Sequence, residues 1–191
     1  MKYKISFGTS DFREIVGNHN FFVDKSLFIK ELLEQNAKVI LIPRPRRFGK
    51  SLNFSMLKYF FDMKEKSANL FKGLEISNEK ECLEHMNKYP VVLISMKDAA
   101  VPNWNLSKKG LKVTMSEIYR DYREEVMDVL DESEKKYYGC IMNEEATDED
   151  LVFSLSKLTK YLERKHGEKV IVLIDEYDAV MTEMYGEKEF I

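Results

Sequence analysis

A short stretch at residues 44–51, with the sequence RPRRFGKS, combines basic side chains, a glycine and a hydroxyl group. Its last three residues match the end of the phosphate-binding pattern G-x-x-x-x-G-K-S/T, a loop whose backbone and lysine surround the phosphates of a nucleotide. Arg44 stands in place of the first glycine of that pattern. The residue types and their spacing predict a site for a nucleoside triphosphate, with the neighbouring arginines adding positive charge.

The residues of this loop have separate physical roles. Gly49 lets the backbone approach the phosphates and adopt dihedral angles closed to other residues. Lys50 is expected to reach the β- and γ-phosphates, and the Ser51 hydroxyl to bind Mg²⁺. The helix that begins here presents N–H groups and a positive dipole end to an anion. The residues expected to bind the nucleotide are Arg46, Arg47, Phe48, Gly49, Lys50, Ser51 and Leu52.

Two carboxylates, Asp175 and Glu176, follow the apolar run at residues 170–174. In open α/β sheets, ligands bind where buried strands end. Asp175 is expected to hold Mg²⁺, through water or through Ser51. Glu176 is expected to orient and deprotonate the attacking water. The two motifs together predict ATP hydrolysis, with Lys50 and Glu176 as the catalytic residues.

Each motif alone has a structural alternative. A Gly-Lys-Ser tripeptide also occurs by chance at a helix start, and an acidic pair also forms a solvated turn after a strand. Here the two occur in one sequence, in the right order and 125 positions apart from Lys50 to Asp175, each after an apolar run. This joint occurrence favours the nucleotide site over the two structural alternatives.

The composition is that of a folded soluble protein. The chain has 191 residues, 44% hydrophobic and 33% charged, which excludes a disordered chain and allows a sizeable core. The net charge of −3 excludes a general attraction to nucleic acid or to an anionic membrane. No run approaches the roughly 18 apolar residues of a spanning helix, and the start of the chain resembles no secretory signal. Cys82 and Cys140 are expected to be thiols, so we expect a cytoplasmic protein with no membrane partner.

Apolar periodicity predicts the elements that position the two motifs. Strands are expected at 38–43, 90–96 and 169–175, and helices at 24–35, 49–62, 79–87, 107–130 and 148–165. Asp24 and Ser26 are expected to cap the first of these helices. Strands that are apolar on both faces and alternate with helices indicate a parallel α/β sheet. The first motif then lies between a strand and a helix, and the second at the end of a strand.

Other residues with chemical potential are assigned structural roles. His19, His85 and His166 have no metal-ligand spacing. Trp104 is expected to pack beneath a loop rather than to stack on a base. The acidic residues at 128–134 are expected to be solvated helix ends.

Several short strings, the two motifs among them, carry a family resemblance. They are FFVDKS at 21–26, RPRRFGKSLN at 44–53, FFD at 60–62, LFKGL at 70–74, PVV at 90–92 and IDEYD at 174–178. Together they resemble the N-terminal part of the AAA-ATPase-like proteins, over nearly the whole chain. The phosphate loop of that family is typically R-P-R-R-F-G-K-S/T, which accounts for Arg44 in place of glycine. The resemblance implies one P-loop NTPase domain at 1–191, a three-layer α/β/α fold with a parallel sheet, and ATP and Mg²⁺ as ligands.

The same resemblance implies that parts of the usual family protein are missing. Family members usually continue further, often into a nuclease domain of the restriction-endonuclease type. A later strand normally lies between the two motif-bearing strands, and nothing after Glu176 resembles it, while 181–191 resembles the start of a helix. We therefore expect a chain truncated after the Walker B strand, with a second copy or a partner chain supplying the missing elements. We expect contact with nucleic acid only through the C-terminal domain that is absent from this chain. The alternative function is a nucleotide-sensing regulatory module that is inactive as this fragment.

Overall fold

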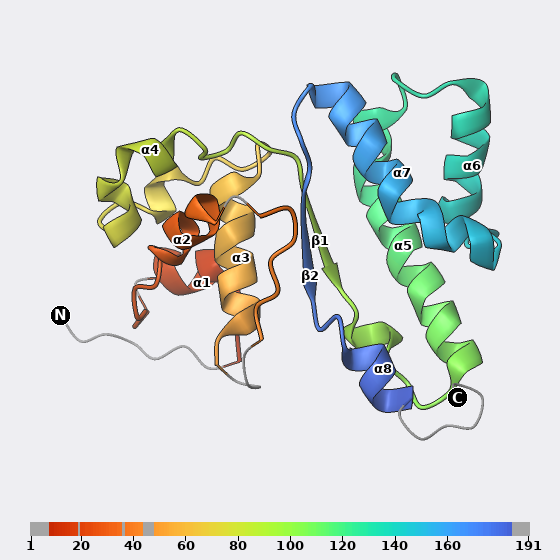
Figure 1. Cartoon of the computed structure of the whole chain (residues 1–191), viewed down its shortest axis with the longest axis horizontal. Coiled ribbons are helices and arrows are strands. Elements are labelled where there is room, and N and C mark those ends of the chain that lie inside the picture. The colour runs from red at the N-terminus through yellow and green to blue at the C-terminus, as the bar shows by residue number, and fades with distance from the viewer. Residues whose placement is uncertain (1–7, 19, 36, 44–47, 185–191) are drawn as a thin grey trace. The chain divides into compact units, whose positions relative to one another are not determined.

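The computed structural model describes residues 8–18, 20–35, 37–43 and 48–184, and it divides into two compact units, Met1–Val91 and Val92–Ile191 (Figure 1). Each unit is described by itself. None of the helices in the described ranges is long and apolar enough to cross a membrane.

The first unit consists mainly of helices. Its elements are α1 (Phe12–Gly17), α2 (Phe28–Glu34), α3 (Lys50–Phe61), the 3-10 helices η1 (Ala68–Leu70) and η2 (Glu75–Asn78), and α4 (Lys80–Leu83). The helix expected at 49–62 is confirmed by α3. The helices expected at 24–35 and 79–87 are present as the shorter α2 and α4.

An aromatic cluster forms the core of the first unit. Phe12, Phe60 and Phe71 are at most 1% exposed. The Phe71 ring stacks on Phe12 with centroids 5.0 Å apart and meets Phe60 edge-on at 5.2 Å, arrangements that aromatic quadrupoles favour. The buried residues of α3, all in its second half, are Met56, Leu57, Tyr59, Phe60 and Phe61. The cluster therefore holds α3 by its C-terminal half and leaves its first turns less buried.

Hydrogen bonds fix the same half of α3. The Tyr59 hydroxyl donates to Asp11 (2.8 Å), which also caps α1. Burial and this bond to Asp11 raise the pKa of Tyr59 to about 12, so the hydroxyl remains a donor. Where α3 ends, Asp62 pairs with Tyr89 in a parallel bridge, and Asn87 donates to the Asp62 carbonyl (2.9 Å). The C-terminal end of α3 is therefore held on two sides.

The segment before α2 corrects one expectation. The N-terminus of α2 has no side-chain cap, so Asp24 and Ser26 do not cap it. Asp24 instead accepts hydrogen bonds from the N–H groups of Ser26 and Glu75, both at 2.8 Å. The Ser26 hydroxyl oxygen accepts from the N–H of Ile76 (3.1 Å). These two residues of the FFVDKS string therefore fasten the chain ahead of α2 to η2.

The strand expected at 38–43 is not observed, because residues 37–43 form no strand in the described part of the chain. Val39 is 88% exposed and Leu41 63%, while Ile40 and Ile42 are partly buried. This alternation is typical of extended backbone, which becomes a strand only when a neighbour takes up its hydrogen bonds. The apolar run predicted a strand buried on both faces, but Val39 and Leu41 are exposed, and no strand pairs with this segment in the described part of the chain.

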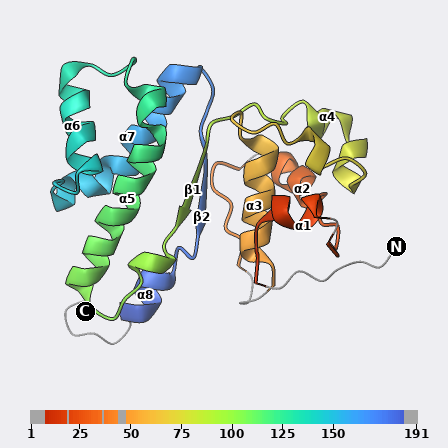
Figure 2. The same ribbon diagram turned by 180° about the vertical axis from the view of Figure 1, so that it is seen from behind.

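The second unit combines strands and helices. Its elements are β1 (Val91–Ser95, which begins at the last residue of the first unit), η3 (Lys97–Ala99), α5 (Trp104–Val126), α6 (Glu132–Met142), α7 (Asp148–His166), β2 (Ile171–Asp175) and α8 (Ala179–Met184). β1 and β2 are parallel neighbours, and the Met96 N–H donates to the Asp175 carbonyl (3.1 Å). The helices α5, α6 and α7 lie on one side of this pair (Figures 1 and 2). The strands expected at 90–96 and 169–175 are confirmed, and the mixed fold is compatible with α/β.

Tyrosine side chains join the three long helices of the second unit. Tyr119 and Tyr138 are fully buried, with ring centroids 4.4 Å apart. The Tyr138 hydroxyl donates to the Tyr119 carbonyl (2.5 Å), and the Tyr119 hydroxyl donates to the Ser154 carbonyl (2.8 Å). Because burial raises the pKa of both tyrosines, both hydroxyls remain protonated donors. These bonds link α5 to α6 and α7, and Val92 and Ile94 of β1 belong to the same core.

α6 is an element that the sequence analysis did not predict. The acidic residues expected to be solvated at 128–134 include Asp131, which caps α6 by accepting from the N–H groups of Ser133 and Glu134, both at 2.8 Å. The Glu134 side chain accepts the Asp131 N–H in return (3.1 Å), which completes a capping box. Trp104, expected in a loop, is the first residue of α5.

Ion pairs fasten the last turn of α7. Arg164 donates two hydrogen bonds to Glu134 (2.7 and 2.8 Å), and Lys165 pairs with Asp128. The hydrogen bond from Arg164 lowers the pKa of Glu134, and the one from Lys165 lowers the pKa of Asp128. Both carboxyl groups are therefore more acidic in the folded chain than in the unfolded chain.

We expect the second unit to lose stability in acid. A carboxylate whose pKa is lowered by folding stabilises the fold above its unfolded pKa, near 3.8 for Asp128 and 4.5 for Glu134. That contribution is lost as the pH falls through the lower folded value, so the urea midpoint should fall between about pH 6 and about pH 3. Circular dichroism measures the midpoint. The double variant Asp128→Asn, Glu134→Gln should show a smaller fall, and an equal fall would contradict this explanation.

We expect Gly110→Ala to destabilise the chain, because Gly110 of α5 lies against η3 with no room for a side chain. A Cβ there would lie 2.8 Å from the Cα of Ala99. The backbone must move, which should lower the free energy of unfolding by about 1–3 kcal/mol in urea denaturation. Gly139→Ala in α6 is the control, because its Cβ meets nothing within 4 Å. The free energy of unfolding of the Gly139→Ala variant should rise by about 0.5–1 kcal/mol. A neutral Gly110→Ala would contradict the close packing.

Candidate nucleotide-binding site

Gly49 of the phosphate-loop motif lies directly before the first residue of α3. It is the N-cap residue of α3, with φ 73° and ψ 24°, the left-handed region that residues with a Cβ rarely adopt. A Cβ at Gly49 would meet nothing within 4 Å, so backbone conformation, and not space, requires the glycine. Arg46 and Arg47, which are expected to bind the nucleotide, lie outside the described residues.

The first turn of α3 carries the other residues of the motif. Lys50, Ser51 and Leu52 are its first three residues, and all are partly buried. Phe48, just before the helix, is 64% exposed. The N–H groups of a first helical turn point out of the end of the helix, toward any bound anion. This turn contains no acidic residue, so no carboxylate of the turn offsets the positive end of the helix dipole.

The segment before the phosphate-loop motif lies beside α3, the helix that follows the motif. A small hollow next to the first turns of α3 is lined by Phe28, Ile42, Lys50, Asn53, Phe54 and Leu57. Ile42 belongs to the extended segment at 37–43, so the apolar side chain before the loop lies near the lysine after it. The partly buried Ile42 therefore lies beside the first turns of α3.

Asp175 and Glu176 form a sharp turn at the end of β2. Asp175 is 9% exposed, and its Oδ1 accepts from the N–H of Glu176 (2.9 Å). Glu176 has φ 52°, in the left-handed region, which costs a residue with a Cβ about 1–2 kcal/mol. Its carbonyl accepts from the N–H of Ala179 (3.0 Å), where α8 begins. The backbone therefore changes direction directly after Asp175, with both carboxylates at the carboxyl end of the strand.

The neighbouring strand adds a residue that the sequence analysis does not single out. Ser95 is the last residue of β1, and the Met96 N–H that follows it donates to the Asp175 carbonyl (3.1 Å). Ser95 is exposed, and its hydroxyl oxygen accepts from the Lys97 N–H (3.4 Å). The available signal is a polar residue at the end of an apolar run, which is also the signal that marks Asp175.

The expected site residues form two groups. Gly49–Leu52 belong to the first unit, and Asp175–Glu176 to the second. Within the described ranges, no group of three or more His, Cys, Asp or Glu residues is placed to hold a metal ion. Mg²⁺ prefers oxygen ligands, keeps several waters and binds phosphate oxygens, so one or two protein ligands are enough. The Ser51 hydroxyl and the Asp175 carboxylate are each an oxygen ligand of the kind that Mg²⁺ prefers.

The histidines and cysteines have other surroundings. His85 Nδ1 lies 2.5 Å from the Tyr89 hydroxyl, and His166 Nε2 lies 2.6 Å from Glu125 Oε1. His19 lies outside the described residues. The two cysteines, Cys82 and Cys140, are free thiols, as expected.

Comparisons with known proteins identify relatives of the chain. The AAA-ATPase-like family, described as predicted AAA-ATPase, matches residues 6–191. A protein of Azotobacter chroococcum mcd 1, named as an uncharacterized protein in the vnfD 5′ region, is 27% identical over 177 residues. This match covers 92% of the chain and 29% of the relative, so the chain spans less than a third of that protein. No solved structure matches the chain significantly.

We expect Glu176→Gly to stabilise the chain. Glycine adopts φ 52° without strain, so the free energy of unfolding in urea should rise by about 0.5–1 kcal/mol. Glu145→Gly is the control, because Glu145 is not among the residues with positive φ. There glycine should destabilise by about 0.5–1 kcal/mol through chain entropy. Equal losses in the two variants would contradict the left-handed backbone at Glu176.

Proposed function

The chain belongs to the AAA-ATPase-like family, and we propose that it binds ATP with Mg²⁺ and hydrolyses it. The observation that carries the proposal is the left-handed Gly49 at the N-cap of α3, followed directly by Lys50 and Ser51. This arrangement joins a backbone conformation suited to glycine with a helix N-terminus, an ammonium group and a hydroxyl. Together these groups suit a triphosphate and its metal ion.

On this proposal, the triphosphate lies at the N-terminus of α3. Backbone N–H groups of Lys50, Ser51 and Leu52 donate to phosphate oxygens, and the Lys50 ammonium lies at the β- and γ-phosphates. The Ser51 hydroxyl is one ligand of the metal ion. Arg46 and Arg47 add positive charge around the phosphates.

The carboxylates at the end of β2 take the other roles. Asp175 would hold the metal ion through water or through Ser51, and Glu176 would orient the attacking water and accept its proton. Mg²⁺, when bound, neutralises charge on the β- and γ-phosphate oxygens. The support for these roles is the place of both carboxylates at the carboxyl end of a parallel strand, where ligands of open α/β sheets bind.

The proposal requires the two groups of residues to meet at one nucleotide. We therefore propose that residues 1–191 form one three-layer α/β/α P-loop domain with a parallel sheet. The parallel pairing of β1 with β2 and the family match over residues 6–191 support this arrangement.

Lys50→Ala should weaken the binding of ATP in the presence of Mg²⁺. A charge-assisted hydrogen bond contributes about 1.5–3 kcal/mol, so its loss should lower the affinity about 10- to 100-fold. Isothermal titration calorimetry measures the affinity. Lys58→Ala, in the last turn of α3, is the matched control and should bind as the unaltered chain does. Equal affinities in the two variants would count against the phosphate loop.

Glu176→Gln should separate binding from turnover. Without the carboxylate that accepts the proton, phosphate release should slow by about 100-fold or more, while ATP affinity changes little. Glu183→Gln, at an exposed position of α8, is the control and should turn over normally. Equal rates in the two variants would exclude Glu176 as the base. An unaltered chain that binds ATP without turnover would favour the nucleotide-sensing module over the enzyme.

A further inference from the structure

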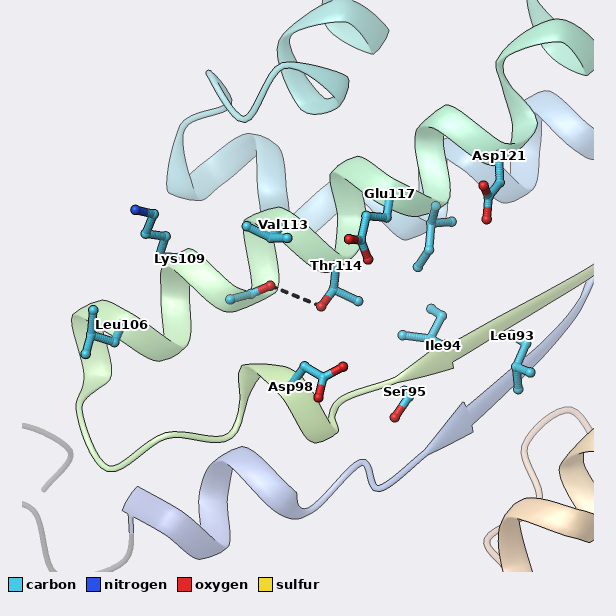
Figure 3. A pocket seen from close by; sticks show the side chains of 12 residues that line it. Leu93, Ile94, Ser95, Asp98, Leu106, Lys109, Val113, Thr114, Glu117 and Asp121 are labelled. Atoms are coloured by element: carbon cyan, nitrogen blue, oxygen red, sulfur yellow. Dashed lines mark hydrogen bonds between the residues drawn. The ribbon is translucent and has the colours of Figure 1, made fainter. Parts of the chain in front are cut away.

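An open groove of about 530 Å³ runs between the outer edge of β1 and one face of α5 in the second unit (Figure 3). Three consecutive residues of β1, Leu93, Ile94 and Ser95, line one wall, so the groove follows the edge of the strand and not one of its faces. α5 lines the other wall through residues three or four apart, from Leu106 to Asp121.

The edge of β1 that faces this groove is open. In the part of the chain that the structure describes, β1 pairs only with β2. The bond from the Met96 N–H to the Asp175 carbonyl sets the register, so the even-numbered residues of β1 direct their backbone groups toward β2. Leu93 and Ser95 direct theirs toward the groove. An open edge presents N–H and C=O groups in the spacing that an added strand requires.

The groove is acidic. Glu117 and Asp121 extend from α5, and Asp98 from η3, toward the space beside β1 (Figure 3). These three carboxylates form no salt bridge with other described residues. Lys109 is the basic residue of the lining, and the buried Ile118 lies between the two acidic positions of α5. The charge of the groove therefore complements a basic ligand. The floor of the groove, formed by Ile94 and Ile118, suits apolar side chains.

The groove has the length of a short strand. Its α5 wall extends over 15 residue steps from Leu106 to Asp121, about 22 Å at 1.5 Å per step. An extended segment of about six or seven residues covers this length at 3.3 Å per residue. A helix in the groove would leave the edge groups of β1 without partners, whereas a strand pairs with them.

We propose that this groove binds an extended, basic segment of a partner protein, which adds to the edge of β1 as a strand. The backbone of the segment pairs with β1, its lysine or arginine side chains meet the three carboxylates, and its apolar side chains cover the floor. Ser95, which lies beside Asp175, lines the groove, but none of the residues that we propose to bind or hydrolyse ATP does so. This proposal therefore stands or fails separately from ATP binding.

A defined probe is the fluorescently labelled, C-terminally amidated peptide VKVKVKV. Fluorescence anisotropy with the whole 191-residue chain should show that this peptide binds and that VEVEVEV does not. Two further peptides carry N-methyl groups on the valine amides or on the lysine amides. One of the two should bind about tenfold more weakly or worse, because its methyl groups face β1. Equal binding of all three VKVKVKV forms would overturn strand addition, and so would equal binding of VEVEVEV.

The role of the two carboxylates that α5 contributes to the groove is tested by the double variant Glu117→Gln, Asp121→Asn. Loss of two carboxylates should weaken the binding of VKVKVKV about fivefold or more. The control is the double variant Glu145→Gln, Glu163→Gln, which removes the same charge from exposed residues that do not line the groove. Its affinity should match that of the unaltered chain. Equal weakening in the two double variants would overturn the proposal, since charge alone would then explain the binding.

Sedimentation distinguishes a partner protein from a second copy of the chain. A chain that is monomeric at the concentrations of the peptide assay supports a partner protein as the occupant. A dimer that dissociates in the Glu117→Gln, Asp121→Asn variant would assign the groove to a second copy and overturn the proposal.

Discussion

The parallel pairing of β1 with β2 is the constraint on which the second unit depends. Parallel neighbours cannot be joined by a hairpin, so the chain from Met96 to Val170 must cross from the end of one strand to the start of the next. The helices α5, α6 and α7 provide this crossing, and their buried tyrosine hydroxyls join them into one layer. The same pairing places Asp175 beside the end of β1 and leaves the other edge of β1 to the acidic groove.

Both groups of candidate site residues depend on a change of backbone direction at the end of an element. Gly49 makes this change before α3 at φ 73°, and Glu176 makes it after β2 at φ 52°. Glycine does so without strain, whereas Glu176 is held there by the bond to Asp175 and by the first bond of the turn into α8. A strained backbone conformation persists only where the surrounding contacts maintain it, and such conformations are often found at functional sites.

Elements with strong local signals were predictable. α3, α7, β1 and β2 follow from the spacing of their apolar residues, which is a property of neighbouring positions. The strand expected at 38–43 failed because a strand also needs a partner, and Val39 and Leu41 have side chains that remain exposed. α6 was missed because the acidic residues that cap it also resemble a solvated helix end. Asp24 was misassigned because its partner Glu75 is 51 positions away.

The sequence by itself determined the types and order of the candidate site residues. A glycine, a lysine and a hydroxyl before one helix, and two carboxylates after one strand, are visible in short windows of the chain. The tertiary structure alone decided the strained backbone of Glu176, the place of Ser95 beside Asp175 and the open edge of β1. Each of these features depends on contacts and on strand pairing between segments far apart in the chain, and no local pattern of residues contains that information.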